Sequence, residues 1–179
     1  MNDYIIRRAT LADCSDIEDL IECSARGLSR HDYSEEQIEA ALASVFGVDT
    51  DLIRDGTYFV AEAPGLLVGC GGWSRRRNLF GGDRYLNREA GELDPSNEPA
   101  KIRAFFVHPD WARKGIGRSI LSLCENEARD WGFQAAELMA TLPGVRLYRA
   151  CGYEEGQPVM HEMASGEKLA LVPMTKVLN

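Results

Sequence analysis

The chain has 179 residues, of which 45% are hydrophobic, and a formal net charge of -8. This length suffices for one well-buried core and is short for two, so we expect a single domain over residues 1–179. The acidic balance argues against nucleic acid as a general partner, because phosphate binding needs a basic surface, and it mildly favours a cationic substrate.

The distribution of apolar residues and cysteines indicates a cytoplasmic protein. The first residues contain no apolar run ahead of their charges, and no window approaches the roughly 20 apolar residues of a membrane span. The cysteines are odd in number and lack CxxC spacing, which argues against both a disulfide framework and a zinc site. They are Cys14, Cys23, Cys70, Cys124 and Cys151. We therefore expect reduced thiols, no metal ion and no membrane association.

The first fifty residues predict a strand followed by two helices. A short β-like run at residues 3–9 leads into a helix over residues 11–28, for which Thr10 supplies an N-cap pattern. A capping box that begins at Ser34 opens a second helix over residues 34–47.

The middle of the chain predicts a hairpin and a long loop. Two β-rich runs, residues 57–63 and 66–74, flank the turn signal Pro64-Gly65, which favours an antiparallel pair. Residues 76–98 are polar and aperiodic. A connection of that length is either a functional loop or contains short elements that the pattern does not reveal.

The rest of the chain alternates strands and helices. The expected elements are a strand at 100–107, a helix at 117–131, a strand at 135–140, a short helix at 145–151 and two strands at 153–163 and 168–178. This interleaving indicates an α/β (α+β) fold, with a mixed central sheet of about six to seven strands and flanking helices in the order β-α-α-β-β-β-α-β-α-β-β.

A glycine-bearing passage from strand to helix predicts an anion site. In VHPDWARKGIGR, residues 107–118, Gly115 and Gly117 leave backbone N–H groups accessible at a helix N-terminus. Basic side chains accompany them at Arg113, Lys114 and Arg118. A phosphate or pyrophosphate is the anion that fits best, and a tight turn without a ligand is the alternative.

The segment FFVHPDWARKGIGRSIL resembles the coenzyme A segment of the GNAT superfamily of acyl-CoA-dependent N-acetyltransferases. Its V-x-P strand end, the G-x-G pair and the following helix match that family's signature, whereas Ala112 stands where the family has Gln or Arg. The resemblance implies acetyl-CoA as cosubstrate and no metal. It also implies that the pyrophosphate is wrapped by Arg113, Lys114, Gly115, Ile116, Gly117 and Arg118, and that the pantetheine arm and acetyl group are held by strand-like backbone bonds from Phe105, Phe106 and Val107.

A second segment, LPGVRLYRACGYEEG, resembles the family's later motif, L-Y-x-x-x-G-F/Y. The resemblance makes Tyr148 the candidate general acid. A phenol of pKa about 10 can protonate a leaving thiolate of intrinsic pKa about 8.5. The alternative is an ordinary packing residue of an amphipathic helix.

The sequence gives fewer signals for the residues that bind and deprotonate the acceptor. An alkylamine of pKa about 10.4 must lose a proton before it attacks, and the strand positions that carry the base in several relatives are here Lys101 and Arg103, which are not bases. We expect Arg103 either to lie in the acceptor cleft and hold a carboxylate, to pair with Glu62 or Glu98, or to end at an exposed strand end. The remaining candidate bases are Glu62, Glu92, Asp94 and Glu98.

Other side chains near the predicted acceptor site are open to two interpretations. Trp73, Tyr33 and Phe80 either line the acceptor pocket or pack in the core or loops, and Trp73 is taken as a substrate-binding candidate. His108 is expected to be a surface or capping residue.

These observations predict an N-acetyltransferase in which a small-molecule or peptide amine attacks acetyl-CoA directly in a ternary complex, with backbone amides stabilising the oxyanion. One alternative is a non-catalytic acyl-CoA-binding or sensor module. Another is a nucleotide-phosphate enzyme that uses the same loop. Dimerisation is common in the family, so a homodimer is a further expectation.

Overall fold

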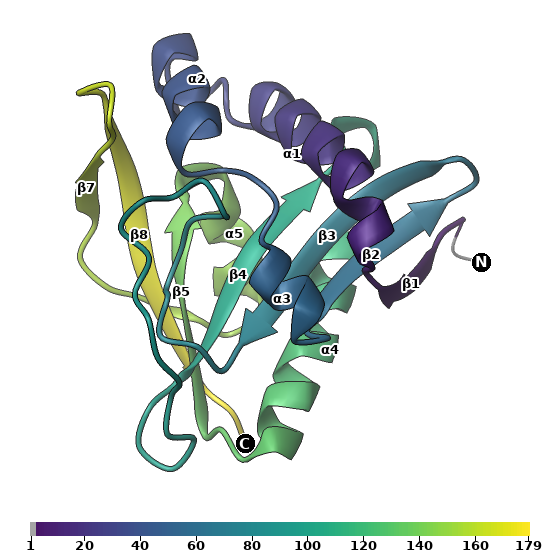
Figure 1. Ribbon diagram of the computed structural model, residues 1–179, viewed down its shortest axis with the longest axis vertical. Coiled ribbons are helices and arrows are strands. Elements are labelled where there is room, and N and C mark those ends of the chain that lie inside the picture. Colours follow the sequence, from purple (N-terminus) through teal and green to yellow (C-terminus); the bar gives the residue numbers. More distant parts are fainter. Residues whose placement is uncertain (1–2) are drawn as a thin grey trace.

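The computed structural model describes residues 3–179, through which a mixed eight-stranded sheet runs (Figure 1). The strand order is β1-β2-β3-β4-β5-β8-β6, and β7 also pairs with β8. The strands are β1 (Ile5–Arg8), β2 (Tyr58–Ala63), β3 (Leu66–Ser74), β4 (Ala100–Val107), β5 (Ala135–Thr141), β6 (Glu154–Glu155), β7 (Val159–Glu162) and β8 (Lys168–Val177). The expected mixed sheet is confirmed, with eight strands rather than six to seven because residues 153–163 divide into β6 and β7.

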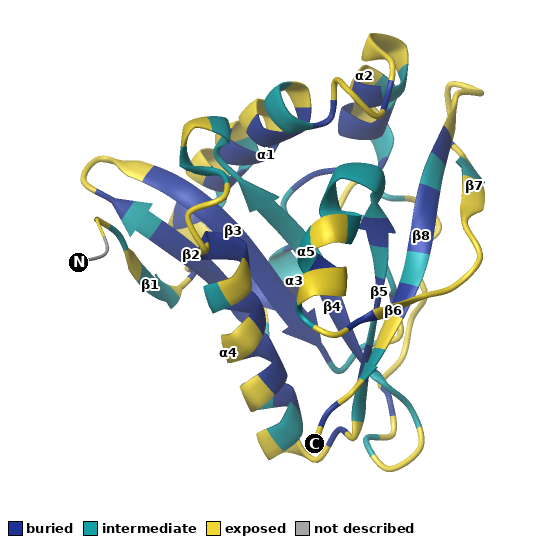
Figure 2. Cartoon of the chain, turned by 180° about the vertical axis from the view of Figure 1, so that it is seen from behind, coloured by how far each residue is buried: buried dark blue, intermediate teal, exposed yellow. Residues whose placement is uncertain are grey.

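Helices cover both faces of this sheet. They are α1 (Cys14–Leu28), α2 (Glu35–Ser44), α3 (Thr50–Arg54), α4 (Ile116–Trp131) and α5 (Val145–Ala150), with short 3-10 turns η1 (Leu11–Asp13), η2 (Pro109–Trp111) and η3 (Leu142–Gly144). In Figure 1 the helices α1, α2 and α3 lie in front of the sheet, and Figure 2 shows α4 and α5 on the opposite face. Each face therefore has its own apolar core. None of the helices in residues 3–179 has the length and apolar composition that a bilayer crossing requires.

Local sequence signals account for several of these elements. Ser34 Oγ accepts a hydrogen bond from Gln37 N–H, and the Gln37 side chain accepts from Ser34 N–H, which is the expected capping box of α2. The strands β2 and β3 pair antiparallel across the predicted turn, where Gly65 has φ +75°. The helix α3 was not predicted, since it is one turn long and begins at an Asp cap, Asp49.

The sheet opens in its middle, between β4 and β5. These parallel strands pair only at Ala100–Ala136 and Lys101–Glu137. Beyond that point β4 bends, because Ala104 has φ +60° and the register with β3 shifts between Cys70 and Gly72. The β5-facing edge of the second half of β4 is consequently left without a strand partner.

The long connection at residues 76–98 contains no helix and only one isolated bridge, between Arg76 and Glu92. Backbone bonds tie it to the α2–α3 connection: Gly82 N–H donates to Val45 O and Asp83 N–H to Val48 O, both at 2.9 Å. The loop therefore forms a fixed wall beside β4.

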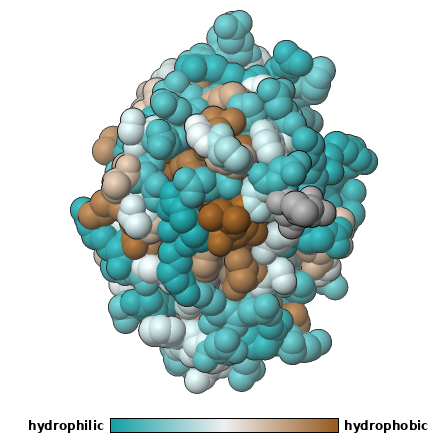
Figure 3. Space-filling model, turned by 90° about the vertical axis from the view of Figure 1, so that its right-hand side faces the viewer, coloured by the Kyte–Doolittle hydropathy of each residue, from teal (hydrophilic) through white to brown (hydrophobic). Residues whose placement is uncertain are grey.

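One edge of the sheet lies far from this wall. Figure 3 shows a mostly hydrophilic face with a small apolar group at its centre, seen from the side on which β1 lies in Figure 1. Ile5 of β1 is 63% exposed. This edge takes no part in the site described below.

Candidate active site

The glycine loop presents free backbone donors at the start of α4. Arg113 and Gly115 both have left-handed φ angles, +64° and +85°. From residue 113 onward, the first N–H group that donates to a backbone carbonyl in the described chain is that of Ser119, which bonds to Gly115 O at 2.9 Å. The N–H groups of residues 113–118 are free, at the positive end of a sixteen-residue helix. This arrangement suits a phosphate or pyrophosphate.

The two glycines serve different purposes. A Cβ built on Gly115 would meet nothing within 4 Å, so this glycine is required for its φ angle alone. A Cβ built on Gly117 would lie 2.9 Å from Leu147 Cδ2 of α5. Gly117 therefore lets the N-terminus of α4 pack closely against the helix that contains Tyr148, so the two sequence motifs touch.

The open edge of β4 continues from this loop. His108 N–H donates to Val68 O at 2.9 Å, and Phe106 pairs with Cys70, so alternation directs the backbone of Val107 toward the open edge. Val107 N–H donates there to Ser24 Oγ at 3.2 Å.

Helix α1 reaches this edge by a close approach. A Cβ on Gly27 would lie only 2.3 Å from Pro109 Cγ, so the glycine allows α1 to pack on the end of β4 and brings Ser24 to Val107. Sequence reasoning missed Ser24 and Gly27, although a glycine next to the last residue of the helix predicted over residues 11–28 was the available signal.

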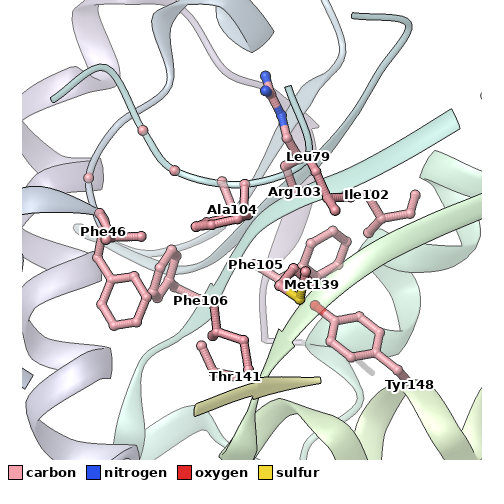
Figure 4. Close-up of a pocket in the computed structure, with 16 residues that line it drawn as sticks. Phe46, Leu79, Ile102, Arg103, Ala104, Phe105, Phe106, Met139, Thr141 and Tyr148 are labelled. Carbon is pink, nitrogen blue, oxygen red and sulfur yellow. The ribbon is translucent and has the colours of Figure 1, made fainter. Parts of the chain in front are cut away.

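Tyr148 faces the space between β4 and β5. Its ring packs edge-on against Phe105, with 6.1 Å between centroids, and against Tyr153 at 5.8 Å. The side chain is 8% exposed, and burial raises the pKa of its hydroxyl well above the usual value. In Figure 4 the hydroxyl points toward Phe105 and Met139.

A pocket of about 70 Å³ lies on this side of β4, lined by 16 residues (Figure 4). Its walls come from β4, β5, β8, α5, the α2–α3 connection and the loop at residues 79–82. Most of the lining is apolar, including Val45, Phe46, Phe80, Phe106, Met139 and Leu171. Phe105 and Tyr148 also line it, so the candidate acid and the open edge of β4 meet in one cavity.

Comparison with known proteins identifies the family. The sequence profile described as the acetyltransferase (GNAT) family matches residues 16–153. The chain belongs to this family. No curated protein sequence matches the chain.

Solved structures share the fold of this GNAT protein over nearly its full length. A GCN5-related N-acetyltransferase from Rhodopseudomonas palustris is 22% identical, with a TM-score of 0.72 over 99% of this chain and 98% of that one. A phosphinothricin acetyltransferase from Sinorhizobium meliloti, in complex with acetyl-CoA, is 19% identical, with a TM-score of 0.64 and coverages of 99% and 90%. A ribosomal-protein-alanine N-acetyltransferase from Brucella melitensis is 21% identical, with a TM-score of 0.63 and coverages of 97% and 99%. The expected fold and family are confirmed, and acetyl-CoA is the cosubstrate that the family uses.

In this GNAT protein Arg103 is buried and paired. Its guanidinium forms an ion pair with Asp49 at 2.8 Å and donates to Asn78 O at 2.9 Å, and its side chain is 1% exposed. The expected pairing with Glu62 or Glu98 is wrong, and so is an exposed strand end. The bulge at Ala104 interrupts the alternation on which those expectations rested. Figure 4 shows the guanidinium directed away from Tyr148.

Asp49 links the pocket wall to the core. Its carboxylate, 1% exposed, also pairs with Arg88 at 3.3 Å, and Arg88 donates to Gly81 O at 2.7 Å. Two carbonyl groups of the loop wall, those of Asn78 and Gly81, are therefore held by two arginines that share one buried carboxylate. Sequence reasoning missed Asp49 in this role.

Trp73 lies on the other face of the sheet from the pocket. It is 2% exposed, donates from Nε1 to Glu127 at 2.9 Å and packs against Trp131 and Phe133. The structure therefore places this substrate-binding candidate in the α4 core. Tyr33 is also a core residue, whose hydroxyl donates to Ala170 O at 2.6 Å, whereas Phe80 does line the pocket.

The candidate bases lie outside the pocket lining. Glu62 pairs with Arg7 at 2.8 Å, and Glu98 pairs with Arg77. Glu92 and Asp94 belong to the long loop and are likewise absent from the lining. His108 caps η2, where it accepts from Asp110 N–H at 3.2 Å, so its expected capping role is confirmed.

The basic side chains of the glycine loop are solvent-exposed. Arg113, Lys114 and Arg118 all face solvent, and Lys114 Nζ lies 4.7 Å from the ring centroid of Trp111. They leave the free N–H groups of residues 113–118 accessible and surround them with positive charge.

Proposed function

We propose that the protein transfers the acetyl group of acetyl-CoA to a primary amine, by direct attack in a ternary complex. One observation carries the proposal: the open edge of β4 runs from the free N–H groups at the start of α4 to a pocket that contains the Tyr148 hydroxyl. A group of the size of a pantetheine arm needs such a continuous edge to reach from a phosphate site to a reaction site.

The residues present fit acetyl-CoA. The free N–H groups of residues 113–118 would hold the pyrophosphate, and the backbone of Phe105 and Val107 would hold the pantetheine arm by strand-like bonds. Phe106, which was expected in the same set, pairs with Cys70 of β3 instead. When bound, acetyl-CoA supplies the thioester carbonyl that the amine attacks. Ala112, which replaces the family's Gln or Arg, costs one side-chain contact and leaves this backbone set intact.

Tyr148 is the proposed general acid. Because burial raises its pKa, the phenol keeps its proton through neutral and mildly alkaline pH. It can donate this proton to the leaving thiolate, whose intrinsic pKa is about 8.5, and regain one from solvent after the products leave.

The names of two relatives support an amine acceptor. The relative from Brucella melitensis is named as an alanine N-acetyltransferase that acts on a ribosomal protein, and the relative from Sinorhizobium meliloti as a phosphinothricin acetyltransferase. The first name specifies transfer to nitrogen on a protein, and the second names phosphinothricin as the acceptor.

Isothermal titration with acetyl-CoA, CoA and ATP tests the cofactor. Gly115→Asp and Gly115→Asn form a matched pair, because both side chains tolerate the left-handed φ angle and have open space there, while only Asp places a negative charge beside the free N–H groups. We expect CoA binding to wild type, about 10-fold or more weaker binding to the Asp variant and a smaller loss in the Asn variant. Absence of CoA binding to wild type contradicts the proposal. CoA binding without transfer to any amine identifies a binding module instead.

A further inference from the structure

We infer that the acceptor is a weakly basic α-amine with an apolar substituent, such as the N-terminus of a peptide or an amino-acid amide. The inference rests on the proposed function and specifies its substrate class. Three features of the pocket carry it: its charged groups, its surrounding carboxylates and its apolar walls.

The pocket lining contains no group that can accept a proton from an ammonium ion near neutral pH. Among its 16 residues there is no carboxylate and no imidazole, and its only charged residue is Arg103. The Arg103 guanidinium is a cation that already binds Asp49 and Asn78 O. A second positive charge on the substrate would meet no counter-ion there.

The carboxylates that adjoin the walls are engaged elsewhere. Asp49 binds Arg103 and Arg88. Glu18 accepts from Val48 N–H at 2.7 Å and pairs with Arg84 at 2.9 Å, and Asp83 accepts from Thr50 N–H at 2.9 Å. These groups hold the wall together, and none of them lines the pocket.

One imidazole lies behind an aromatic ring of the pocket wall. His161 of β7 packs against Phe80, with 5.1 Å between ring centroids, and against Tyr85 at 5.6 Å. Phe80 lines the pocket and His161 does not. A base at His161 would have to act around the Phe80 side chain.

The acceptor must therefore arrive already neutral. At pH 7.4 an α-amine of pKa about 7.9 is about one quarter neutral, whereas an alkylamine of pKa about 10.4 is about one part in a thousand neutral. This is a difference of roughly 200-fold in the concentration of reactive amine. Polyamines and polycationic amines are disfavoured further, because their remaining charges would be desolvated without partners.

The apolar walls of the pocket favour an acceptor amine with an apolar substituent. The side chains of Phe46, Phe106, Met139 and Leu171 stabilise an apolar group by excluding it from water. In the reaction the neutral amine forms a C–N bond as the C–S bond breaks. After the attack the nitrogen releases one of its two protons to water, and the leaving thiolate receives a proton from Tyr148. The products are an amide and a free thiol.

The test compares leucinamide with 3-methylbutylamine, which has the same apolar group on an alkylamine. We expect kcat/KM at pH 7.4 to favour leucinamide by about 200-fold, and the ratio to approach one by about pH 10.5. In each pH profile kcat/KM should rise and level off at the pKa of that acceptor. Titration of the CoA-saturated protein should likewise show 3-methylbutylamine binding more tightly as the pH rises.

Three results would overturn the inference. One is a rise of kcat/KM at the same pH in both profiles, because that rise would belong to an enzyme base, and its loss in His161→Gln would identify the base. Another is a higher kcat/KM for spermidine than for leucinamide at pH 7.4. A third is equal kcat/KM for both amines at that pH. Absence of CoA binding would instead overturn the proposed function, so the two failures are distinguishable.

A matched pair of variants at one wall residue sharpens the test. Met139→Glu introduces a carboxylate into the lining, and Met139→Gln introduces a neutral group of the same shape. We expect the preference for leucinamide at pH 7.4 to fall at least 10-fold in the Glu variant relative to the Gln variant, because the new carboxylate can bind an ammonium ion and accept its proton. An unchanged preference in a folded Glu variant would contradict the inference.

Discussion

The proposed cofactor side and the proposed acceptor side of the site are built in different ways. The cofactor side consists of one contiguous segment, residues 105–118, and its functional groups are mainly backbone N–H groups. The acceptor pocket draws on residues between Val45 and Leu171, and its loop wall depends on buried ion pairs. A site made of local backbone tolerates many side chains, whereas a wall held by buried charges depends on each partner.

The largest expected effect lies where the two sides meet. Tyr148→Phe should lower kcat by about 100-fold or more, because general acid catalysis contributes about 10²–10⁴-fold, and should leave CoA binding within about 2-fold of wild type. Steady-state kinetics and calorimetry measure the two quantities. The control is Tyr153→Phe, since Tyr153 packs against Tyr148 and does not line the pocket. Equal losses of kcat in both variants would contradict the role of Tyr148.

The pH dependence of kcat has a defined sign. The donor form of Tyr148 is present below its pKa and disappears as the pH rises through it, and this pKa is raised by burial. We therefore expect the alkaline loss of kcat to lie above the value of about 10 of an ordinary phenol. A loss centred below pH 9 that is absent in Tyr148→Phe would contradict this assignment.

Asp49→Asn should disturb the acceptor pocket and leave acetyl-CoA binding nearly unchanged. It leaves Arg103 buried without its ion pair and lowers the free energy of unfolding by about 3–5 kcal/mol, as urea denaturation measures. In the folded variant the acceptor KM should rise, while the KM of acetyl-CoA changes by less than about 2-fold. Asp55→Asn is the control, because Asp55 pairs with Arg76 and not with the arginines that bind the wall carbonyls. Equal changes in both KM values of Asp49→Asn would remove the distinction between the two sides.

Substitution of Gly115 or Gly117, on the cofactor side, should have a smaller effect on the free energy of unfolding. Gly117→Ala should cost about 1–3 kcal/mol, because its Cβ displaces Leu147, and adding Leu147→Ala should restore part of the loss. Gly115→Ala should cost about 1–2 kcal/mol through its φ angle, and Leu147→Ala should not restore it. Thermal unfolding of the four variants measures the difference. Rescue of both glycine variants, or of neither, would contradict the separate roles.

Ser24→Ala should have the smallest effect. It removes the acceptor of the Val107 N–H group, so the free energy of unfolding should fall by about 1 kcal/mol. CoA binding should be unchanged or slightly tighter, because that N–H group becomes free for the pantetheine arm. A loss of CoA affinity above 10-fold would mean that the Ser24 hydroxyl itself contacts the cofactor.

Much of the fold could be predicted because its signals are local. The hairpin turn at Pro64-Gly65 and the capping box at Ser34 each involve residues within one turn, and both were found in the predicted places. The helix α3 was not predicted, because its five residues are too few to show a helical periodicity. The split of residues 153–163 into two strands escaped as well, since it depends on pairing with β8.

In the site, too, the residues with local sequence signals were proposed, and those that depend on long-range contacts were missed. The glycine loop and Tyr148 were proposed from contiguous motifs, and their roles stay predictions. The surroundings of Arg103 were mispredicted because one residue, Ala104, adopts a left-handed φ angle that no sequence pattern announces. Asp49 could not be recognised, because Arg88 lies 39 residues away in the chain and only the folded loop brings them together.

The narrow junction between β4 and β5 also bears on the order of folding. The strands β2 and β3 form a tight hairpin, whereas β5 joins β4 through two residue pairs and itself depends on β8. The pocket includes Leu171 of β8, so it cannot form until this last long strand is in place. The pocket also unites Val45 with Leu171, and contacts between residues so far apart in the sequence slow folding. Ligand binding by this protein should accordingly appear only in the final phase of refolding, after much of the sheet has acquired its hydrogen bonds.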